Sequence, residues 1–213
     1  MNICLFIVLP AIATMTTLAK PITGLISGTY NFTEDADYLN APIILVILSS
    51  MMITYSISDI IYGQILLPTK KEKYYLYALL GGTILNAVLS VVFGKYVFTN
   101  NPGLGVAIGT SVTDLLILVF LCSVSWKWIK KAIFNFNSLK IFAVTLVILG
   151  ISLLLRNPLY NLGYKLSNNY AVALVVELLG VVLLDAVVYI VALLLLKEDL
   201  ISSFFRKKEN VNG

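Results

Sequence analysis

Residues 62–90, YGQILLPTKKEKYYLYALLGGTILNAVLS, place a short basic turn between two apolar segments. The first segment stops at Pro68, and the lysines Lys70, Lys71 and Lys73 follow before tyrosines open the second segment. Proline does not continue a helix, and lysines that flank apolar helices stay on the cytoplasmic side of a membrane. The stretch therefore predicts a hairpin of two membrane-spanning helices with its turn in the cytoplasm.

The composition of the whole chain is also typical of a membrane protein. Of its 213 residues, 59% are hydrophobic and 12% are charged, and the mean hydropathy is +0.93. A soluble domain carries about 25% charged residues, which it needs to cover its surface. The net charge of +4 comes from short basic clusters beside apolar runs, which indicates topology signals and not a nucleic-acid-binding surface. We therefore predict an integral membrane protein.

Six segments are apolar over the ~20 residues that a helix needs to cross the hydrocarbon core. We therefore predict an all-α polytopic protein with a single six-helix membrane domain over residues 1–213 and a cytoplasmic tail at 197–213. The first helix is expected to kink at Pro10 and to continue through Pro21 as a shallow interfacial turn. The predicted spans are 3–19, 41–62, 74–95, 104–124, 139–157 and 170–196.

The orientation follows from Lys and Arg in the connections. Taken in order along the chain, the connections and the tail hold one, three, one, four, two and four of these residues. Loops rich in lysine and arginine remain in the cytoplasm. The alternation predicts that the N-terminus and the C-terminus are both cytoplasmic.

Small residues repeat on one face of the third span. Gly82, Ser90 and Gly94 lie on this face at intervals of four or eight residues, and Gly105 and Gly109 form a GxxxG pattern in the fourth span. Small side chains let the backbones of membrane helices approach closely. The pattern predicts a tightly packed hairpin, and a pair of helices that lines a substrate path remains the functional alternative to pure packing.

Polar residues inside the spans are the candidates for function. A charge in the bilayer centre costs at least ~2.5 to 3.5 kcal/mol, so each must face protein, water or a partner. Asp59 lies near the inner end of its span, where it can reach the interface. Arg156, at the predicted outer end of span five, either pairs with Glu177 or extends to the interface. The candidates for a substrate or ion pathway are Asn86, Asp114, Arg156, Glu177 and Asp185.

Several enzyme classes are excluded by what the sequence lacks. It has no histidine, which removes imidazole bases and most zinc sites, and it has no P-loop motif. We expect no catalytic residues, no metal site and no cofactor. Transport, lipid flipping and scaffolding remain.

Residues 62–90 and the segments on either side of them also resemble a known family. GQILLP, the KKEK turn and YLYALLGGTILNAVLS resemble polysaccharide-biosynthesis flippases of the Wzx type, in the multidrug, oligosaccharidyl-lipid and polysaccharide exporter superfamily. GLGVAIGTSVTDLLILVFL looks like the family's next helix, a glycine- and alanine-rich run that leads into an acidic residue, here Asp114. LPAIATMTTLAKPITGLISG is similar to the preceding helix. Members usually have 12 to 14 spans, so this chain matches roughly the last six, as a C-terminal portion or fragment would.

The resemblance implies a function in a bacterial plasma membrane. Such flippases move undecaprenyl-pyrophosphate-linked oligosaccharide from the inner to the outer leaflet by alternating access driven by an ion gradient. Asp114 or Glu177 would then be the proton or sodium site. The implied partners are membrane lipids, the lipid-linked oligosaccharide, and either the missing N-terminal half of the flippase or proteins of polysaccharide assembly, but no nucleic acid.

Three alternatives stay open. A drug or small-solute exporter of the same superfamily shares the expected fold. A non-transporting membrane fragment or scaffold would account for the half length. A six-helix transporter that completes itself as a dimer would require an internal repeat, and residues 1–103 and 104–213 show no convincing one.

Overall fold

The computed structural model describes residues 2–28, 38, 40–133 and 136–195, and all regular structure in these ranges is helical. The prediction of an all-α polytopic protein is confirmed. The predicted tail at 197–213 lies outside the described residues. The elements are α1 (Asn2–Thr17), α2 (Ala19–Ser27), α3 (Ala41–Ile61), η1 (Tyr62–Leu66), α4 (Glu72–Val92), η2 (Phe93–Val97), α5 (Pro102–Ile133), α6 (Phe136–Ser167) and α7 (Tyr170–Leu195), where η marks a π-helix.

Five stretches of the described chain are long and apolar enough to cross a membrane, and a sixth is bent. The bent stretch joins α1 and α2 at an angle of 61°. Helix α1 continues through Pro10, and the break falls at Leu18. The segment expected to be an interfacial turn after Pro21 is the short helix α2. The five straight stretches are 41–66, 72–97, 102–129, 140–167 and 170–192.

Two helices are longer than the sequence analysis predicts. Helix α5 reaches Ile133 instead of ending near residue 124, and α6 reaches Ser167 instead of residue 157. Hydropathy marks only the part of a helix that lies in hydrocarbon, whereas backbone hydrogen bonding continues into polar sequence. Pro158 removes one N–H from α6 without ending it, because neighbouring helices can satisfy the freed backbone groups.

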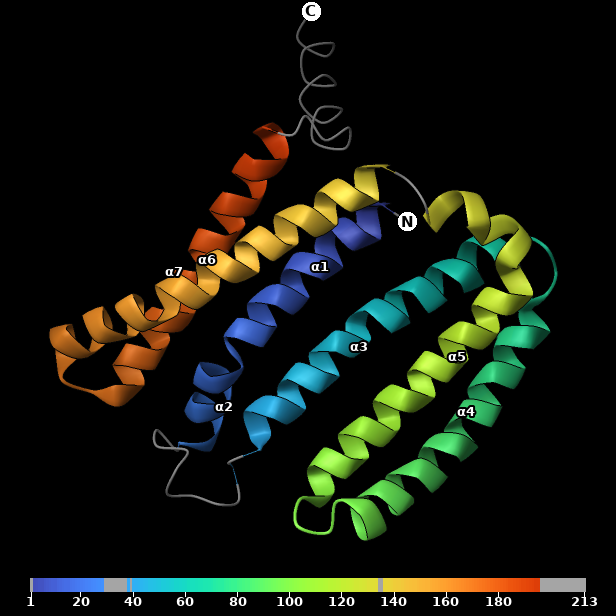
Figure 1. Cartoon of the computed structure of the whole chain (residues 1–213), viewed down its shortest axis with the longest axis horizontal. Coiled ribbons are helices and arrows are strands. Elements are labelled where there is room, and N and C mark those ends of the chain that lie inside the picture. Colours follow the sequence, from blue (N-terminus) through green and yellow to red (C-terminus); the bar gives the residue numbers. More distant parts are fainter. Residues whose placement is uncertain (1, 29–37, 39, 134–135, 196–213) are drawn as a thin grey trace, which may run out of the picture. The chain divides into compact units, whose positions relative to one another are not determined.

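The helices form two compact units. Unit 1 contains α3, α4 and α5, with η1 and η2 at the ends of α3 and α4. Unit 2 contains α1, α2, α6 and α7. Figure 1 shows α4 and α5 running side by side within unit 1, and α6 and α7 meeting within unit 2.

The basic turn of unit 1 has a defined geometry. Lys70 adopts a left-handed conformation with φ of 56°, and the N–H groups of Lys70 and Lys71 bond to the carbonyls of Leu67 and Leu66 at 3.1 and 2.8 Å. These two bonds form a Schellman motif, which satisfies the last carbonyls of the preceding helix. The π-helix η1 ends at Leu66, and Pro68 lies in the last turn of the hydrogen bonding, because the N–H of Thr69 still bonds to the carbonyl of Ile65 at 3.2 Å. The apolar segment thus stops around Pro68, as the sequence predicts.

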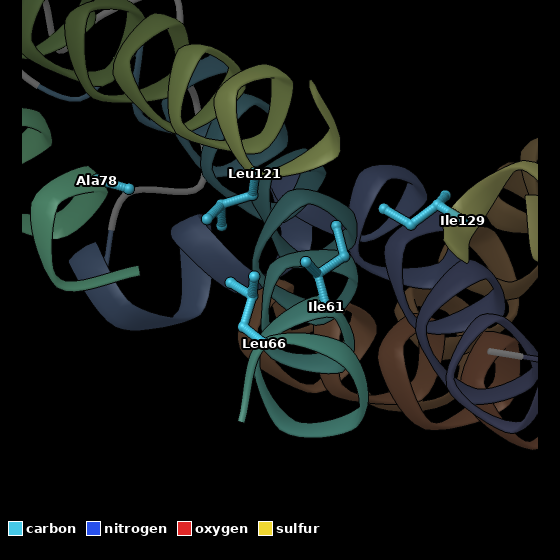
Figure 2. Packing of buried hydrophobic residues seen from close by; sticks show 5 residues of the cluster. All are labelled: Ile61, Leu66, Ala78, Leu121 and Ile129. Carbon is cyan, nitrogen blue, oxygen red and sulfur yellow. The ribbon is translucent and has the colours of Figure 1, made fainter. Parts of the chain in front are cut away.

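The apolar core of unit 1 lies near the end of the helices that carries this turn. Figure 2 shows its five buried residues, Ile61, Leu66, Ala78, Leu121 and Ile129, which come from α3, η1, α4 and α5. Beside it, the ammonium group of Lys71 lies 4.9 Å from the ring centroid of Trp128. The apolar residues thus pack together at one end of the three-helix unit, and polar residues lie near the middle of its helices.

Candidate functional site

The contact between α4 and α5 depends on glycines. A Cβ atom on Gly105 would lie 2.6 Å from the backbone oxygen of Phe93, and one on Gly82 would lie 2.3 Å from the side chain of Ile117. Real Cβ atoms essentially never come within 3.0 Å of another atom. The predicted close packing of this hairpin is therefore confirmed.

The rest of the predicted packing face lies in the same contact. A Cβ atom on Gly109 would lie 3.1 Å from the backbone of Leu89 and Ser90, and one on Gly94 would lie 3.4 Å from the oxygen of Pro102. Glycine is thus used on both helices where the backbones approach most closely.

Asn86 joins the two helices by hydrogen bonds. Its Oδ1 atom accepts one from the Ser90 hydroxyl at 3.0 Å, within α4, and one from the Thr110 hydroxyl of α5 at 3.1 Å. A carbonyl oxygen has two lone pairs and can accept both bonds, although the Thr110 hydroxyl also lies 2.9 Å from the Val106 carbonyl of its own helix and shares its one proton between the two acceptors. The Nδ2 group of Asn86 remains as a donor at the edge of the contact.

A polar cavity of about 220 Å³ lies beside Asn86 within unit 1. It extends from the middle of α4, at Asn86, towards the basic turn, at Tyr75. It brings together two predicted site residues, Asn86 and Asp114. Its lining is Thr54, Tyr55, Ser58, Tyr75, Leu79, Gly82, Thr83, Asn86, Thr113, Asp114 and Ile117.

Asp114 supplies the carboxylate of this cavity. The hydroxyl of Tyr55, on α3, lies close enough to the Asp114 carboxylate to interact with it. The Oδ2 atom of Asp114 is buried and has no hydrogen-bond partner among the described residues. A buried carboxylate oxygen without a donor is costly, so the cavity favours an occupant that can donate to it.

Asp59 lies outside the cavity lining. Its exposed side chain accepts a hydrogen bond of 3.4 Å from the hydroxyl of Tyr75, whose ring stacks on Tyr62 with centroids 4.3 Å apart. From the sequence, Asp59 is predicted near the inner end of its span, where it can reach the interface. Its exposure fits a structural contact better than a binding role.

In unit 2, Glu177 and Arg156 form an ion pair. The Nε atom of Arg156 lies 3.0 Å from Oε1 of Glu177, and the two side chains are 26% and 4% exposed. The hypothesis that these residues pair is confirmed. Arg156 was placed too far out in the sequence analysis, because α6 continues for about three turns beyond it, to Ser167. It is therefore a cation inside the stretch that can span a membrane.

The same arginine contacts the break in the first span. The Nη1 group of Arg156 donates to the backbone oxygen of Thr17, at the end of α1, over 3.5 Å. The end of a helix carries unpaired carbonyls and a partial negative charge. Arg156 thus joins α6, α7 and the α1–α2 break through one side chain.

Asp185 has different partners, although it shares α7 with Glu177. Its carboxylate accepts hydrogen bonds from Thr14 of α1 at 2.9 Å and from Ser152 of α6 at 2.5 Å. It is 5% exposed and borders an apolar hollow of about 570 Å³ between α7 and the α1–α2 segment. Glu177 and Asp185 therefore serve two separate sets of contacts within unit 2.

Sequence reasoning missed the hydroxyl partners Thr14, Tyr55, Thr110 and Ser152. Serine and threonine are common in membrane helices, where they often bond to a carbonyl of their own helix, so a hydroxyl gives no signal in the sequence. No protein-family model, curated protein or solved structure matches this chain.

Proposed function

We propose that this chain takes part in the translocation of an undecaprenyl-pyrophosphate-linked oligosaccharide across a bacterial plasma membrane. It would act as the C-terminal portion of a Wzx-type flippase, with both termini in the cytoplasm. The observation that carries the proposal is the polar cavity of unit 1, which combines Asn86 and Asp114 between helices that can span a membrane. A sugar needs hydrogen-bonding partners at that depth, because hydrocarbon offers none.

The hydroxyl and amide groups of the cavity suit this role. Threonine, serine, tyrosine and asparagine side chains can exchange hydrogen bonds with sugar hydroxyls, and a carboxylate can accept from them. A gradient of protons or sodium ions would supply the energy, as the family resemblance implies. Asp114, or Glu177 in unit 2, would then be the candidate coupling site.

Deletion of the gene in the organism that carries it tests the proposal directly. We expect lipid-linked oligosaccharide to accumulate in the inner leaflet and surface polysaccharide to fall. Complementation with Asp114→Asn or Asn86→Leu should leave the protein inserted and restore less than a tenth of the polysaccharide. The matched control, Gly81→Ala, changes a residue with open space around it and should restore export fully.

Two outcomes would contradict the proposal. If deletion lowers efflux of cationic dyes while surface polysaccharide is unchanged, the chain belongs to a small-solute exporter. If neither dye efflux nor polysaccharide changes, the chain is a non-transporting membrane protein or scaffold.

A further inference from the structure

The cavity of unit 1 offers many hydrogen-bond acceptors and few donors. The hydroxyls of Thr54, Thr83 and Thr113 each donate to a carbonyl of their own helix, at 2.7 to 2.9 Å. A hydroxyl has one proton and two lone pairs, so these oxygens can only accept from an occupant. The Oδ2 atom of Asp114 adds a further acceptor, which lacks a partner among the described residues.

The charge of the cavity has one sign. Asp114 is the single ionisable acid or base in the lining apart from two tyrosines, and no lysine or arginine lines it. A phosphate or an acidic sugar would meet a carboxylate of the same charge and no cationic partner. A cationic group would instead form an ion pair and donate hydrogen bonds to the free acceptors.

The volume of the cavity and the atoms that line it determine which cations it can hold. Ca²⁺ and Mg²⁺ take about six to eight oxygen ligands, whereas the lining of this cavity holds one carboxylate, and the described residues hold no cluster of three acidic, cysteine or histidine side chains. Drug-sized ligands occupy pockets of roughly 300 to 1,000 Å³, whereas this cavity measures about 220 Å³. A small organic ammonium group, such as one carried on a single sugar ring, fits both limits.

We propose that this cavity is a subsite for an amino sugar with a free amine. The ammonium group pairs with Asp114 and donates to the threonine oxygens, while the Nδ2 group of Asn86 donates to a ring hydroxyl. The sugar part of this assignment depends on the proposed function, whereas the preference for an ammonium group depends on the cavity alone.

The test is a binding measurement on the purified full chain in lipid nanodiscs, at constant pH and constant ionic strength in potassium chloride. Glucosamine, glucose, N-acetylglucosamine and glucuronate are compared by saturation-transfer NMR. We expect glucosamine to bind at least tenfold tighter than the other three. Asp114→Asn should reduce this preference to less than twofold, whereas Glu72→Gln, an exposed acid at the start of α4, should leave it unchanged.

The comparison of the four sugars on the wild-type chain tests the inference even if Asp114→Asn fails to fold. Several results of that comparison would overturn it. Equal binding of glucosamine and glucose, or loss of the preference when sodium replaces potassium, rules out an ammonium subsite and leaves glycan translocation standing. If ethanolamine competes for the cavity as well as glucosamine does, the sugar ring is not recognised. This result rules out the amino sugar and contradicts the proposed function, while the preference for an ammonium group stands.

Discussion

Nε of Arg156 and Oε1 of Glu177 lie 3.0 Å apart, so a cation of α6 and a carboxylate of α7 neutralise each other inside unit 2. The Glu177 side chain is only 4% exposed. Removal of one partner from such a pair leaves the other charge buried and uncompensated, which costs ~3 to 5 kcal/mol. The pair therefore contributes to the stability of unit 2 chiefly because neither charge is tolerated alone.

Arg156→Met should lower the free energy of unfolding by about 3 kcal/mol for this reason. The double variant Arg156→Met with Glu177→Met should recover most of the loss, because neither charge is then buried. Denaturation of the purified chain in mixed micelles measures both. Lys165→Met, which removes an exposed cation of the same helix, is the control. If Arg156→Met and Lys165→Met lower the free energy of unfolding equally, the stabilising role of the pair is contradicted.

The α4–α5 contact predicts opposite effects for two glycine substitutions. Gly105→Ala places a methyl group 2.6 Å from the backbone oxygen of Phe93, so the helices must separate, and overpacking of this kind costs ~1 to 3 kcal/mol. Gly81→Ala meets no atom within 4 Å and should stabilise α4 by roughly 0.5 to 1 kcal/mol.

Thermal denaturation of the two variants in the same detergent measures this difference. Both changes add one methyl group and both lie in a spanning stretch, so insertion is matched. A Gly105→Ala protein as stable as the wild type would show that the α4–α5 backbones are not in close contact.

Helix position and packing face could be predicted from the sequence because both depend on local properties. The apolar segment at 41–62 became α3 with η1, and the small residues of the third span became the contact face with α5. The ends of α5 and α6 could not be predicted, because high hydropathy marks only the part of a helix that lies in the hydrocarbon. The backbone hydrogen bonds of both helices continue into polar sequence beyond that part. The error at α6 is the reason that Arg156 was placed at a helix end.

The partners of the acidic residues could be predicted only where the partner carries a charge. Arg156 was identified as a candidate partner for Glu177, because its charge is opposite and its predicted depth in span five is comparable to that of Glu177 in span six. Thr14 and Ser152, the partners of Asp185, lie 138 residues apart in the chain, and nothing in their sequence context distinguishes them from other hydroxyls. Their assembly depends on the packing of α1 and α6 against α7.

The hydroxyl contacts of Asp185 should be measurable one at a time. Thr14→Val and Ser152→Ala each remove a donor to the carboxylate, and hydrogen bonds between membrane helices are worth about 0.6 to 1.7 kcal/mol. Each variant should lose stability in that range in the same denaturation assay. Thr23→Val is the matched control, because that hydroxyl bonds only to carbonyls of its own helix. Losses no larger than the control's would show that Asp185 does not hold the three helices together.

The two ends of the stretch formed by α4 and η2 should label from opposite sides of the membrane. Lys73 and Asn100 are both exposed; Lys73 is the second residue of α4, next to the basic turn, and Asn100 lies just beyond the end of η2. Loops rich in lysine stay in the cytoplasm, so Lys73→Cys should react with a membrane-impermeant maleimide only after permeabilisation, and Asn100→Cys should react in intact cells. Cys4 and Cys122, the free cysteines of the described chain, are first replaced by alanine. The reverse pattern of labelling would invert the proposed topology and place the basic turn outside.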